Sequence, residues 1–186
     1  MREIIYMVHT SLDGCIEGPN GEFDWPLMGP ELSAYSQELT ARAGEFGYGR
    51  KVWEMMSSFW PTAESVSDHP HDIAFAPVWR ETPKVVFSRT LEKADWNTRV
   101  LSGDLATEVA ALKAEDTKDL VVMGGAELSG ELSRLGLIDE YLVFVHPVVL
   151  GGSKRPFAEG AERLGLTLVE SRVIDGQVVM LRHRRA

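Results

Sequence analysis

Cysteine is nearly absent from this sequence, which has Cys15 alone among its 186 residues. A single cysteine excludes an internal disulfide framework and is typical of a reducing cytoplasm. No apolar run approaches the roughly 20 residues that a membrane-spanning helix needs. Residues 1–8 also lack the long apolar core and the small-residue cleavage site of a signal peptide. The sequence therefore predicts a cytoplasmic protein without a membrane segment.

Basic residues are in the minority, because 19 lysines and arginines stand against 28 aspartates and glutamates, for a formal net charge of −9. A general nucleic-acid binder needs a basic face, so this balance argues against that class of function. The phosphate-binding signature Gly-x-x-x-x-Gly-Lys-Ser/Thr is missing too, which argues against a small kinase. An anionic ligand must therefore be held by a local basic cluster that works against the overall negative field.

The composition is that of an ordinary globular protein. With 186 residues, 44% of them hydrophobic and 25% charged, the chain is expected to form one domain over residues 1–186. Strand-like apolar runs alternate with helical patterns, which predicts an α/β fold with a mainly parallel sheet. The expected strands cover residues 4–9, 84–88, 120–123, 140–145, 166–174 and 177–183.

Three segments show apolar residues at helical spacing. The first follows Pro30, which suits a first helical turn, and the second follows Asp104, a predicted N-cap. The third follows Gly124-Gly125 and is expected to end at Gly136. Helices at these places would form the crossover connections between the parallel strands.

The end of the chain differs from the rest. Asp175-Gly176 separates the last two strand-like runs, which is a strong signal for an antiparallel hairpin. The expected sheet is therefore mixed. Residues 57–83 are the least regular part, and we expect a surface excursion there with one short helix near 73–79.

The stretch 120–128 is the most informative of the chain. An apolar, β-branched run meets Gly124-Gly125 and then a helical pattern, which predicts a strand, a tight turn and a helix N-terminus. Glycine lets backbone N–H groups approach a phosphate closely, and the helix dipole favours a negative charge there. The alternative is a glycine turn that serves chain geometry alone.

Two further segments place cations where a phosphate could bind. Gly49 precedes Arg50 and Lys51 at a helix start, where cations are unfavourable unless something negative binds beside them. Ser88 and Arg89 follow an apolar strand, and ligands of open α/β sheets bind outside the carboxyl ends of the strands. The alternatives are a solvated basic turn and an ordinary polar turn.

Read in order, these segments resemble the dihydrofolate reductase superfamily, and most of all the reductase domain of the bifunctional riboflavin-biosynthesis deaminase–reductase. The resemblance extends over nearly the whole chain. It rests on Gly-Arg-Lys-Val-Trp at 49–53, Val-Phe-Ser-Arg at 86–89 and Gly-Gly-Ala-Glu-Leu at 124–128, with similar stretches at 11–16, 135–140 and 147–152. It implies a three-layer fold, with helices on both faces of the sheet, and NADPH as the cofactor.

The resemblance also implies which residues hold NADPH. Gly49, Arg50 and Lys51 would meet the phosphates, and Ser88 and Arg89, together with Arg50, would hold the adenosine 2′-phosphate. Ile16 and Gly18 would flank the nicotinamide. The pyrophosphate would rest on the backbone of Gly124, Gly125, Ala126, Glu127 and Leu128. Val52 departs from the family, which often has threonine there, so one hydroxyl contact is lost.

On the substrate side, Trp25, Pro26 and Glu31 resemble the tryptophan, proline and acidic residue that dihydrofolate reductases place beside the pterin. The resemblance implies that Glu31 binds a ring edge and assists protonation, with Asp24 as a second candidate. The alternatives are that Glu31 is a first-turn acid that complements the helix dipole and that Asp24 is a turn residue.

Other departures leave the substrate open. Val145 stands where dihydrofolate reductases usually have threonine, and Met123 stands where the riboflavin reductases usually have an acid. The predicted activity is hydride transfer from NADPH to a small pterin, pyrimidine or other conjugated heterocycle or carbonyl, with a riboflavin-pathway aminouracil ribosyl phosphate among the candidates. The alternative is a nucleotide-binding protein without turnover. We also expect a homodimer, with the apolar segment 143–150 offering an edge.

Several suggestive residues have simpler interpretations. Asp13 is expected to be a turn residue. The histidines near residues 68–72 are separated by Pro70, which favours a solvated loop over a metal site. His9 and His146 lie in strand patterns and are expected to be partly buried and hydrogen-bonded.

Overall fold

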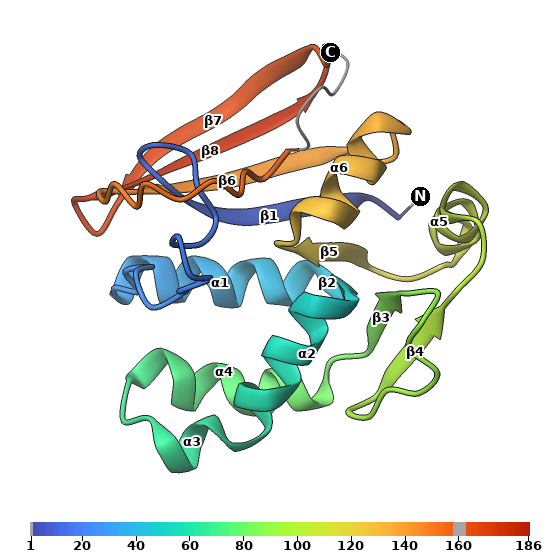
Figure 1. The fold of residues 1–186 in the computed structure, drawn as a ribbon, viewed down its shortest axis with the longest axis horizontal. Helices are drawn as coiled ribbons and strands as arrows, with labels where there is room; N and C mark the ends of the chain where they lie inside the picture. Colours follow the sequence, from blue (N-terminus) through green and yellow to red (C-terminus); the bar gives the residue numbers. More distant parts are fainter. Residues whose placement is uncertain (1, 158–162) are drawn as a thin grey trace.

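The computed structural model describes residues 2–157 and 163–186. Its centre is an eight-stranded sheet with the order β4-β3-β2-β5-β1-β6-β8-β7 (Figure 1). The strands are β1 (Ile4–Ser11), β2 (Ala43–Gly49), β3 (Lys84–Phe87), β4 (Thr98–Leu101), β5 (Asp119–Met123), β6 (Glu140–His146), β7 (Leu166–Ile174) and β8 (Val178–Arg185). The helices are α1 (Pro30–Arg42), α2 (Arg50–Phe59), α3 (Ala63–Val66), α4 (Pro70–Glu81), α5 (Leu105–Ala114) and α6 (Ala126–Arg134), with a 3₁₀ turn at Trp60–Thr62.

The sheet is mixed but mostly parallel, as the sequence predicts. All pairings from β4 through β6 are parallel, and β8 joins β6 and β7 in antiparallel fashion. The last two strands form the expected hairpin, and Asp175 and Gly176 have φ values of 51° and 68° at its turn. Positive φ at both central residues is the requirement of a type I′ turn, which explains the Asp-Gly pair.

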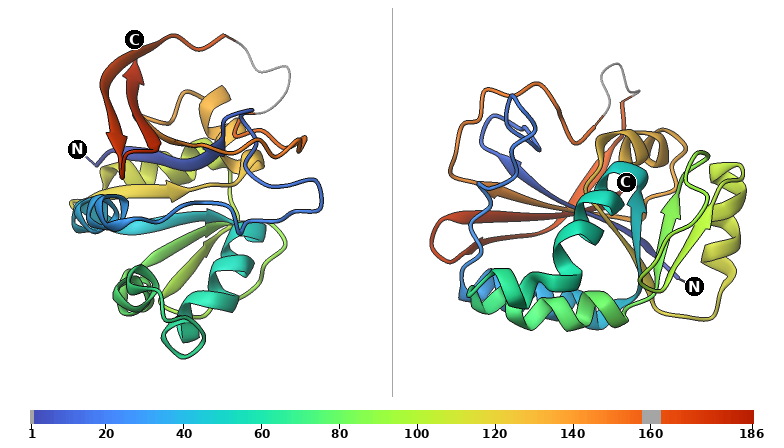
Figure 2. Two further views of the ribbon diagram at one scale, coloured as in Figure 1. Left: turned by 90° about the vertical axis from the view of Figure 1, so that its left-hand side faces the viewer. Right: turned by 60° about the horizontal axis from the view of Figure 1, so that its bottom comes forward.

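Side-chain alternation along the central strands builds two separate cores. In β1, Ile4 and Tyr6 pack on one face while Ile5 packs on the other. Leucines and aromatic residues of α1, α2 and α4 cover the Ile5 face, and α5 and α6 cover the Ile4 face. The three-layer arrangement that the resemblance implies is therefore confirmed (Figure 2).

The predicted helix boundaries agree with the observed caps. The Asp104 carboxylate accepts a hydrogen bond of 3.0 Å from the backbone N–H of Thr107 and so caps α5. The chain leaves α6 through Gly136 at φ 65°. None of the described helices is long and apolar enough to cross a membrane.

The prediction for residues 57–83 is wrong in extent, because most of this segment is helical. Pro70 begins α4, and Phe75, Ala76 and Trp79 are buried along one side of that helix. Burial of these large side chains against the sheet outweighs the polar residues that suggested a loop. The short strand β4 was not predicted, since its four residues carry little pattern.

The expectation of an edge at residues 143–150 is also wrong. Strand β6 lies between β1 and β8, and its backbone is paired on both sides. The edges of the sheet are β4 and β7 instead. A pairing surface for another chain must therefore be sought at these strands or on a face of the sheet.

Candidate functional site

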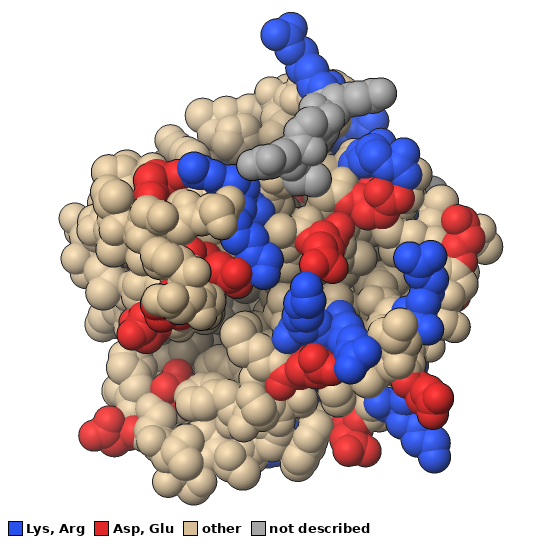
Figure 3. Space-filling model, in the orientation of Figure 1, with Lys and Arg blue, Asp and Glu red and all other residues tan. Residues whose placement is uncertain are grey.

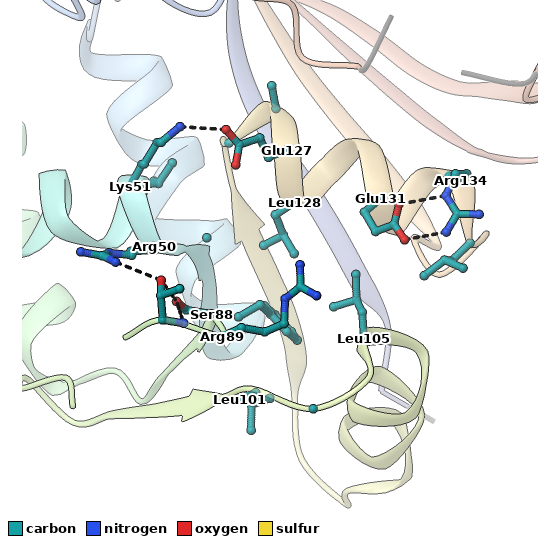
Figure 4. A pocket seen from close by; sticks show the side chains of 18 of the residues that line it. Arg50, Lys51, Ser88, Arg89, Leu101, Leu105, Glu127, Leu128, Glu131 and Arg134 are labelled. Atoms are coloured by element: carbon teal, nitrogen blue, oxygen red, sulfur yellow. Dashed lines mark hydrogen bonds and ion pairs between the residues drawn. The ribbon is translucent and has the colours of Figure 1, made fainter. Parts of the chain in front are cut away.

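A cleft of about 680 Å³ opens at the carboxyl ends of β2, β3 and β5 (Figure 4). Such a volume suits a small-molecule ligand. The cleft gathers three segments that are far apart in sequence, and nine of the predicted cofactor residues line it. These are Gly49, Arg50, Lys51, Ser88, Arg89, Gly125, Ala126, Glu127 and Leu128.

The N-terminus of α6 opens onto the cleft. Gly124 and Gly125 precede it at φ 58° and 80°, a left-handed conformation that glycine adopts without steric cost. No side chain caps this helix, whereas Asp104 caps α5 at the same cleft. The first N–H groups of α6 are therefore available to an anionic ligand, and the helix dipole adds to the attraction.

A second uncapped helix begins at the same place. Helix α2 follows Gly49, and no side chain accepts from its first turn. A methyl group on Gly125 would lie 3.2 Å from Cγ2 of Val52, so glycine at this position lets the start of α6 approach α2 closely. Two helix N-termini thus face one cleft, which is an electrostatically favourable place for phosphate.

The cations that start α2 are held by exposed partners. The Arg50 guanidinium contacts Glu54 at 2.7 Å and Thr90 Oγ1 at 2.9 Å, and Lys51 Nζ contacts Glu127 at 2.8 Å. The hydrogen bond to Glu127 raises the pKa of Lys51. Exposed ion pairs contribute little stability, so these cations can exchange a carboxylate for a ligand phosphate at small cost. Figure 3 shows basic groups gathered near the start of α2.

Arg89 differs from Arg50 and Lys51, because its guanidinium has no hydrogen-bond acceptor among the described residues. Its side chain is exposed and points into the cleft, and no acceptor contacts it among the described residues (Figure 4). The Ser88 hydroxyl oxygen accepts from the N–H groups of Thr90 at 3.3 Å and Leu91 at 3.0 Å, which fixes the turn that carries Arg89. A planar guanidinium and a nearby hydroxyl suit a phosphate monoester.

The predicted nicotinamide residues lie beside the cleft rather than in its lining. The N–H of Ile16 donates to the carbonyl of Lys154 at 3.0 Å, and Lys154 does line the cleft. Gly18 donates to the Glu22 carbonyl within the same loop. Gly124 likewise lies just outside the lining, one residue before Gly125.

Asp13 has a structural role that the sequence only partly indicates. Its carboxylate accepts from the Ser11 hydroxyl and from the N–H groups of Leu150 and Gly151, at 3.1 and 2.9 Å for the last two. These hydrogen bonds hold the pKa of Asp13 well below its usual range. The contact joins the loop after β1 to the segment after β6, so the motifs at 11–16 and 147–152 lie side by side.

The substrate-side residues are spread over a different region. Glu31 accepts from the N–H of Asp175 at 2.7 Å, and the Asp175 carboxylate accepts from the N–H groups of Glu31 and Leu32 at 2.9 and 3.0 Å. The two acids form a reciprocal cap between α1 and the hairpin. This geometry agrees with the capping alternative for Glu31.

The other two predicted substrate residues lie in the loop before α1. Trp25 packs edge-on against the ring of His146, with 5.6 Å between centroids. Asp24 is exposed, and no hydrogen bond or ion pair involves it within the part of the chain that the structure describes. His146 is hydrogen-bonded, as the sequence predicts, but the sequence did not indicate that its partner is His9, whose Nδ1 lies 2.8 Å from Nε2 of His146.

The histidines of residues 68–72 lie at the start of α4, where His69 is the N-cap residue, and not in a solvated loop. His69 Nδ1 accepts from the N–H of His71 at 3.2 Å, and Asp72 accepts from the Ser67 hydroxyl at 2.7 Å. Among residues 2–157 and 163–186, no three histidine, cysteine or acidic side chains are grouped so as to hold a metal ion.

Solved structures of other proteins share this fold. A putative riboflavin biosynthesis protein from Shewanella sp. PV-4 superposes with a TM-score of 0.77 at 23% identity, covering 100% of this chain and 99% of that one. Dihydrofolate reductase from Enterococcus faecalis, solved with NADP(H), gives a TM-score of 0.65 at 14% identity, covering 98% and 96%. At these identities the likeness establishes the fold.

Comparison of sequences identifies a family as well as a fold. The protein named uncharacterized protein YyaP of Bacillus subtilis (strain 168) is 32% identical over 183 residues, which cover 97% of this chain and 93% of YyaP. The family model described as the RibD C-terminal domain matches residues 2–180. Because that match extends over nearly the entire chain, the protein belongs to the RibD C-terminal domain family.

Proposed function

We propose that residues 1–186 form one reductase domain that transfers a hydride from NADPH to a small heterocyclic or carbonyl substrate. The observation that carries this proposal is the pair of uncapped helix N-termini, α2 and α6, that face one cleft beside the unpaired Arg89 guanidinium. A dinucleotide has phosphates at two separate places, and the cleft offers separate donors for each. The dihydrofolate reductase of the same fold, solved with NADP(H), supports this choice.

Different residues of the cleft would bind different parts of the cofactor. The backbone N–H groups of Gly125, Ala126 and Glu127 would hold the pyrophosphate, with Lys51 adding charge. Arg89, Ser88 and Arg50 would hold the adenosine 2′-phosphate, which is the feature that separates NADPH from NADH. The cofactor supplies the hydride, and the protein supplies orientation and a fixed electrostatic environment.

The substrate side is proposed at the loop between β1 and α1. Trp25 is suited to border a planar ring because its indole is fixed against His146 and bonds to the Glu22 carbonyl at 3.3 Å. Asp24 lies in the same loop and stays a candidate proton donor. Within the proposed class, an aminouracil ribosyl phosphate is the candidate that the riboflavin-related neighbour favours.

One observation favours a second candidate, a nucleotide-binding protein without turnover. The Glu31 carboxylate is bound to Asp175, so the acid expected beside the substrate already has a structural partner. A protein that kept the cofactor cleft but lost its substrate acid would bind NADPH and reduce nothing.

A substrate screen separates the two candidates. The purified protein is incubated with NADPH and, in turn, with dihydrofolate, dihydropterins, flavins and riboflavin precursors, and absorbance at 340 nm is followed. The reductase proposal predicts NADPH oxidation that saturates with one of these compounds. Tight NADPH binding without oxidation by any of them would favour the binding protein instead.

A further inference from the structure

Two histidines form a hydrogen-bonded pair at the carboxyl ends of the neighbouring strands β1 and β6. Nδ1 of His9 lies 2.8 Å from Nε2 of His146, and the His9 ring stacks on Phe144 with 5.0 Å between centroids. His146 is buried, whereas His9 is half-buried. No carboxylate lies within hydrogen-bond distance of either ring among the described residues.

A backbone donor fixes the protons of this pair. The N–H of Leu27 donates to Nδ1 of His146 at 3.1 Å. Because a backbone N–H can only donate, Nδ1 of His146 carries a lone pair and the neutral ring carries its proton on Nε2. That Nε2–H must donate to Nδ1 of His9. The neutral His9 ring therefore carries its own proton on Nε2.

The Nε2–H of His9 has no acceptor within the described chain. The buried side-chain nitrogens and oxygens without a partner in that part are Nε of Arg2 and Nε of Arg182. Nε2 of His9 is not one of them, so it is accessible to solvent. Burial, together with the neighbouring His146 and His71, lowers the pKa of His9 to about 3, and burial lowers that of His146 to about 4. At neutral pH the pair is an uncharged donor rather than an acid.

The pair lies next to the proposed cofactor cleft. The Met7 carbonyl accepts from the N–H of Gly124 at 2.9 Å, which joins β1 to the glycine turn. His9 follows Met7 by two residues on the same face of β1, a distance of about 7 Å along the strand. Trp25 and Leu27, which contact His146, belong to the loop that also reaches Lys154 through Ile16. Figure 3 shows the surface hollowed where this loop faces α2.

The chemistry of the pair differs from that of an acid beside the substrate. A carboxylate accepts hydrogen bonds and therefore recognises an amidine-like edge that donates them. A neutral imidazole N–H recognises the opposite, a carbonyl oxygen or an unprotonated ring nitrogen. Glu31, the acid expected to recognise a donating edge, is held at the hairpin by Asp175.

Resting on the reductase function proposed above, we propose that His9 is a substrate-binding residue whose Nε2–H donates to a carbonyl oxygen or ring nitrogen of a neutral heterocycle. Leu27 and His146 act as positioning groups, since they fix the tautomer and the orientation of the His9 ring. The site thereby selects heterocycles that present an acceptor and discriminates against those that present an amidine edge.

Nuclear magnetic resonance of the full-length protein labelled with ¹⁵N-histidine tests this assignment. Uracil serves as the probe with carbonyl acceptors. Benzamidine, which is protonated at neutral pH and only donates hydrogen bonds, serves as the probe with an amidine edge. Each is titrated to millimolar concentration with and without saturating NADPH. We expect His9 to be the Nε2–H tautomer, and its Nε2 resonance to move saturably with uracil and not with benzamidine. His183, on β8, is the internal reference.

Two variants test whether the change in the His9 resonance reports the binding of uracil. His9→Gln is expected to weaken uracil binding at least tenfold and to leave NADPH affinity, measured by fluorescence quenching, within twofold of the parent. His183→Gln should change neither. An unshifted His9 resonance, an equal response to both probes or the Nδ1–H tautomer would overturn the assignment. Failure of NADPH to bind would refute the reductase proposal alone, because the uracil titration without cofactor still reports on His9.

Discussion

At the scale of single residues, long-range hydrogen bonds decide which polar groups are free to act. Arg89 follows a strand and contacts no hydrogen-bond acceptor among the described residues. Glu31 and Asp13, in contrast, both accept from backbone N–H groups more than a hundred residues away in the sequence. A carboxylate that already satisfies backbone donors is costly to redirect. The available side chains are therefore cationic at the proposed cofactor cleft and neutral at the histidine pair.

The reciprocal cap gives a prediction for Glu31. Replacing it with alanine removes the acceptor for Asp175 N–H, and Asp175→Gly removes the acceptors for α1 while keeping the positive φ that this turn needs. Each change should lower the free energy of unfolding by about 1 kcal/mol in urea denaturation. NADPH affinity should stay within twofold in both. Loss of turnover in Glu31→Ala but not in Asp175→Gly would instead give Glu31 a direct part in the reaction.

The histidine pair gives a prediction about pH. The pKa of His146 is about 4 in the folded protein, below the ordinary value of 6.5, so the unfolded chain binds more protons than the folded one between these values. The contribution of the neutral His146 ring to the free energy of unfolding is therefore complete above pH 6.5, and it is lost as pH falls toward 4. In His146→Gln the free energy of unfolding should fall less steeply between pH 6 and 5, by about 1 kcal/mol per pH unit. Parallel curves for the two proteins would contradict the lowered pKa.

At the scale of elements, the sequence predicts the strands and turns that have strong local patterns. It does not predict the bounds of elements that are stabilised mainly by burial against the rest of the fold. The runs that become β1, β5 and β6 are recognisable because their apolar residues fill both faces of a central sheet. Helix α4 was predicted too short, as a helix near 73–79, because the sheet that buries Phe75 and Trp79 stabilises a longer helix than the local pattern indicates. Strand β4 is short and lies at an edge, so its pattern is weak.

The same distinction applies to the candidate site. The gathering of these segments at one cleft could be predicted, because each is a local strand-to-helix or strand-end signal and parallel strands bring these ends to one edge of the sheet. The substrate side could not be predicted in the same way. It depends on contacts such as Leu27 with His146, which join residues 119 positions apart.

At the scale of the whole molecule, the C-terminal hairpin leaves one sheet face uncovered. Val145, Val179 and Val173 lie opposite one another across β6, β8 and β7 and so share a face. Val173 and Val179 are 60% and 37% exposed. A row of uncharged apolar side chains at a sheet edge is self-complementary when two copies meet about a twofold axis. We expect the homodimer here rather than at residues 143–150.

Light scattering after gel filtration checks this prediction. The parent protein should have the mass of a dimer, and Val173→Lys should convert it to a monomer, because the new charge would be buried against the second copy. Val66→Lys is the matched control, since Val66 is also exposed, at 69%, but lies on α3. A monomeric parent protein, or equal effects of the two substitutions, would contradict this interface.

The comparison of NADPH with NADH tests the central claim most directly. Both cofactors are titrated into the parent protein, into a variant with Arg50→Ala and Arg89→Ala, and into Lys93→Ala, which removes an exposed cation outside the cleft. A charge-assisted hydrogen bond contributes about 1.5–3 kcal/mol, so the parent should prefer NADPH by at least about tenfold. The double variant should bind both cofactors with the affinity of the parent for NADH, and Lys93→Ala should match the parent. Equal affinities in the parent protein, or a preference that survives in the double variant, would contradict an NADPH site between α2 and α6.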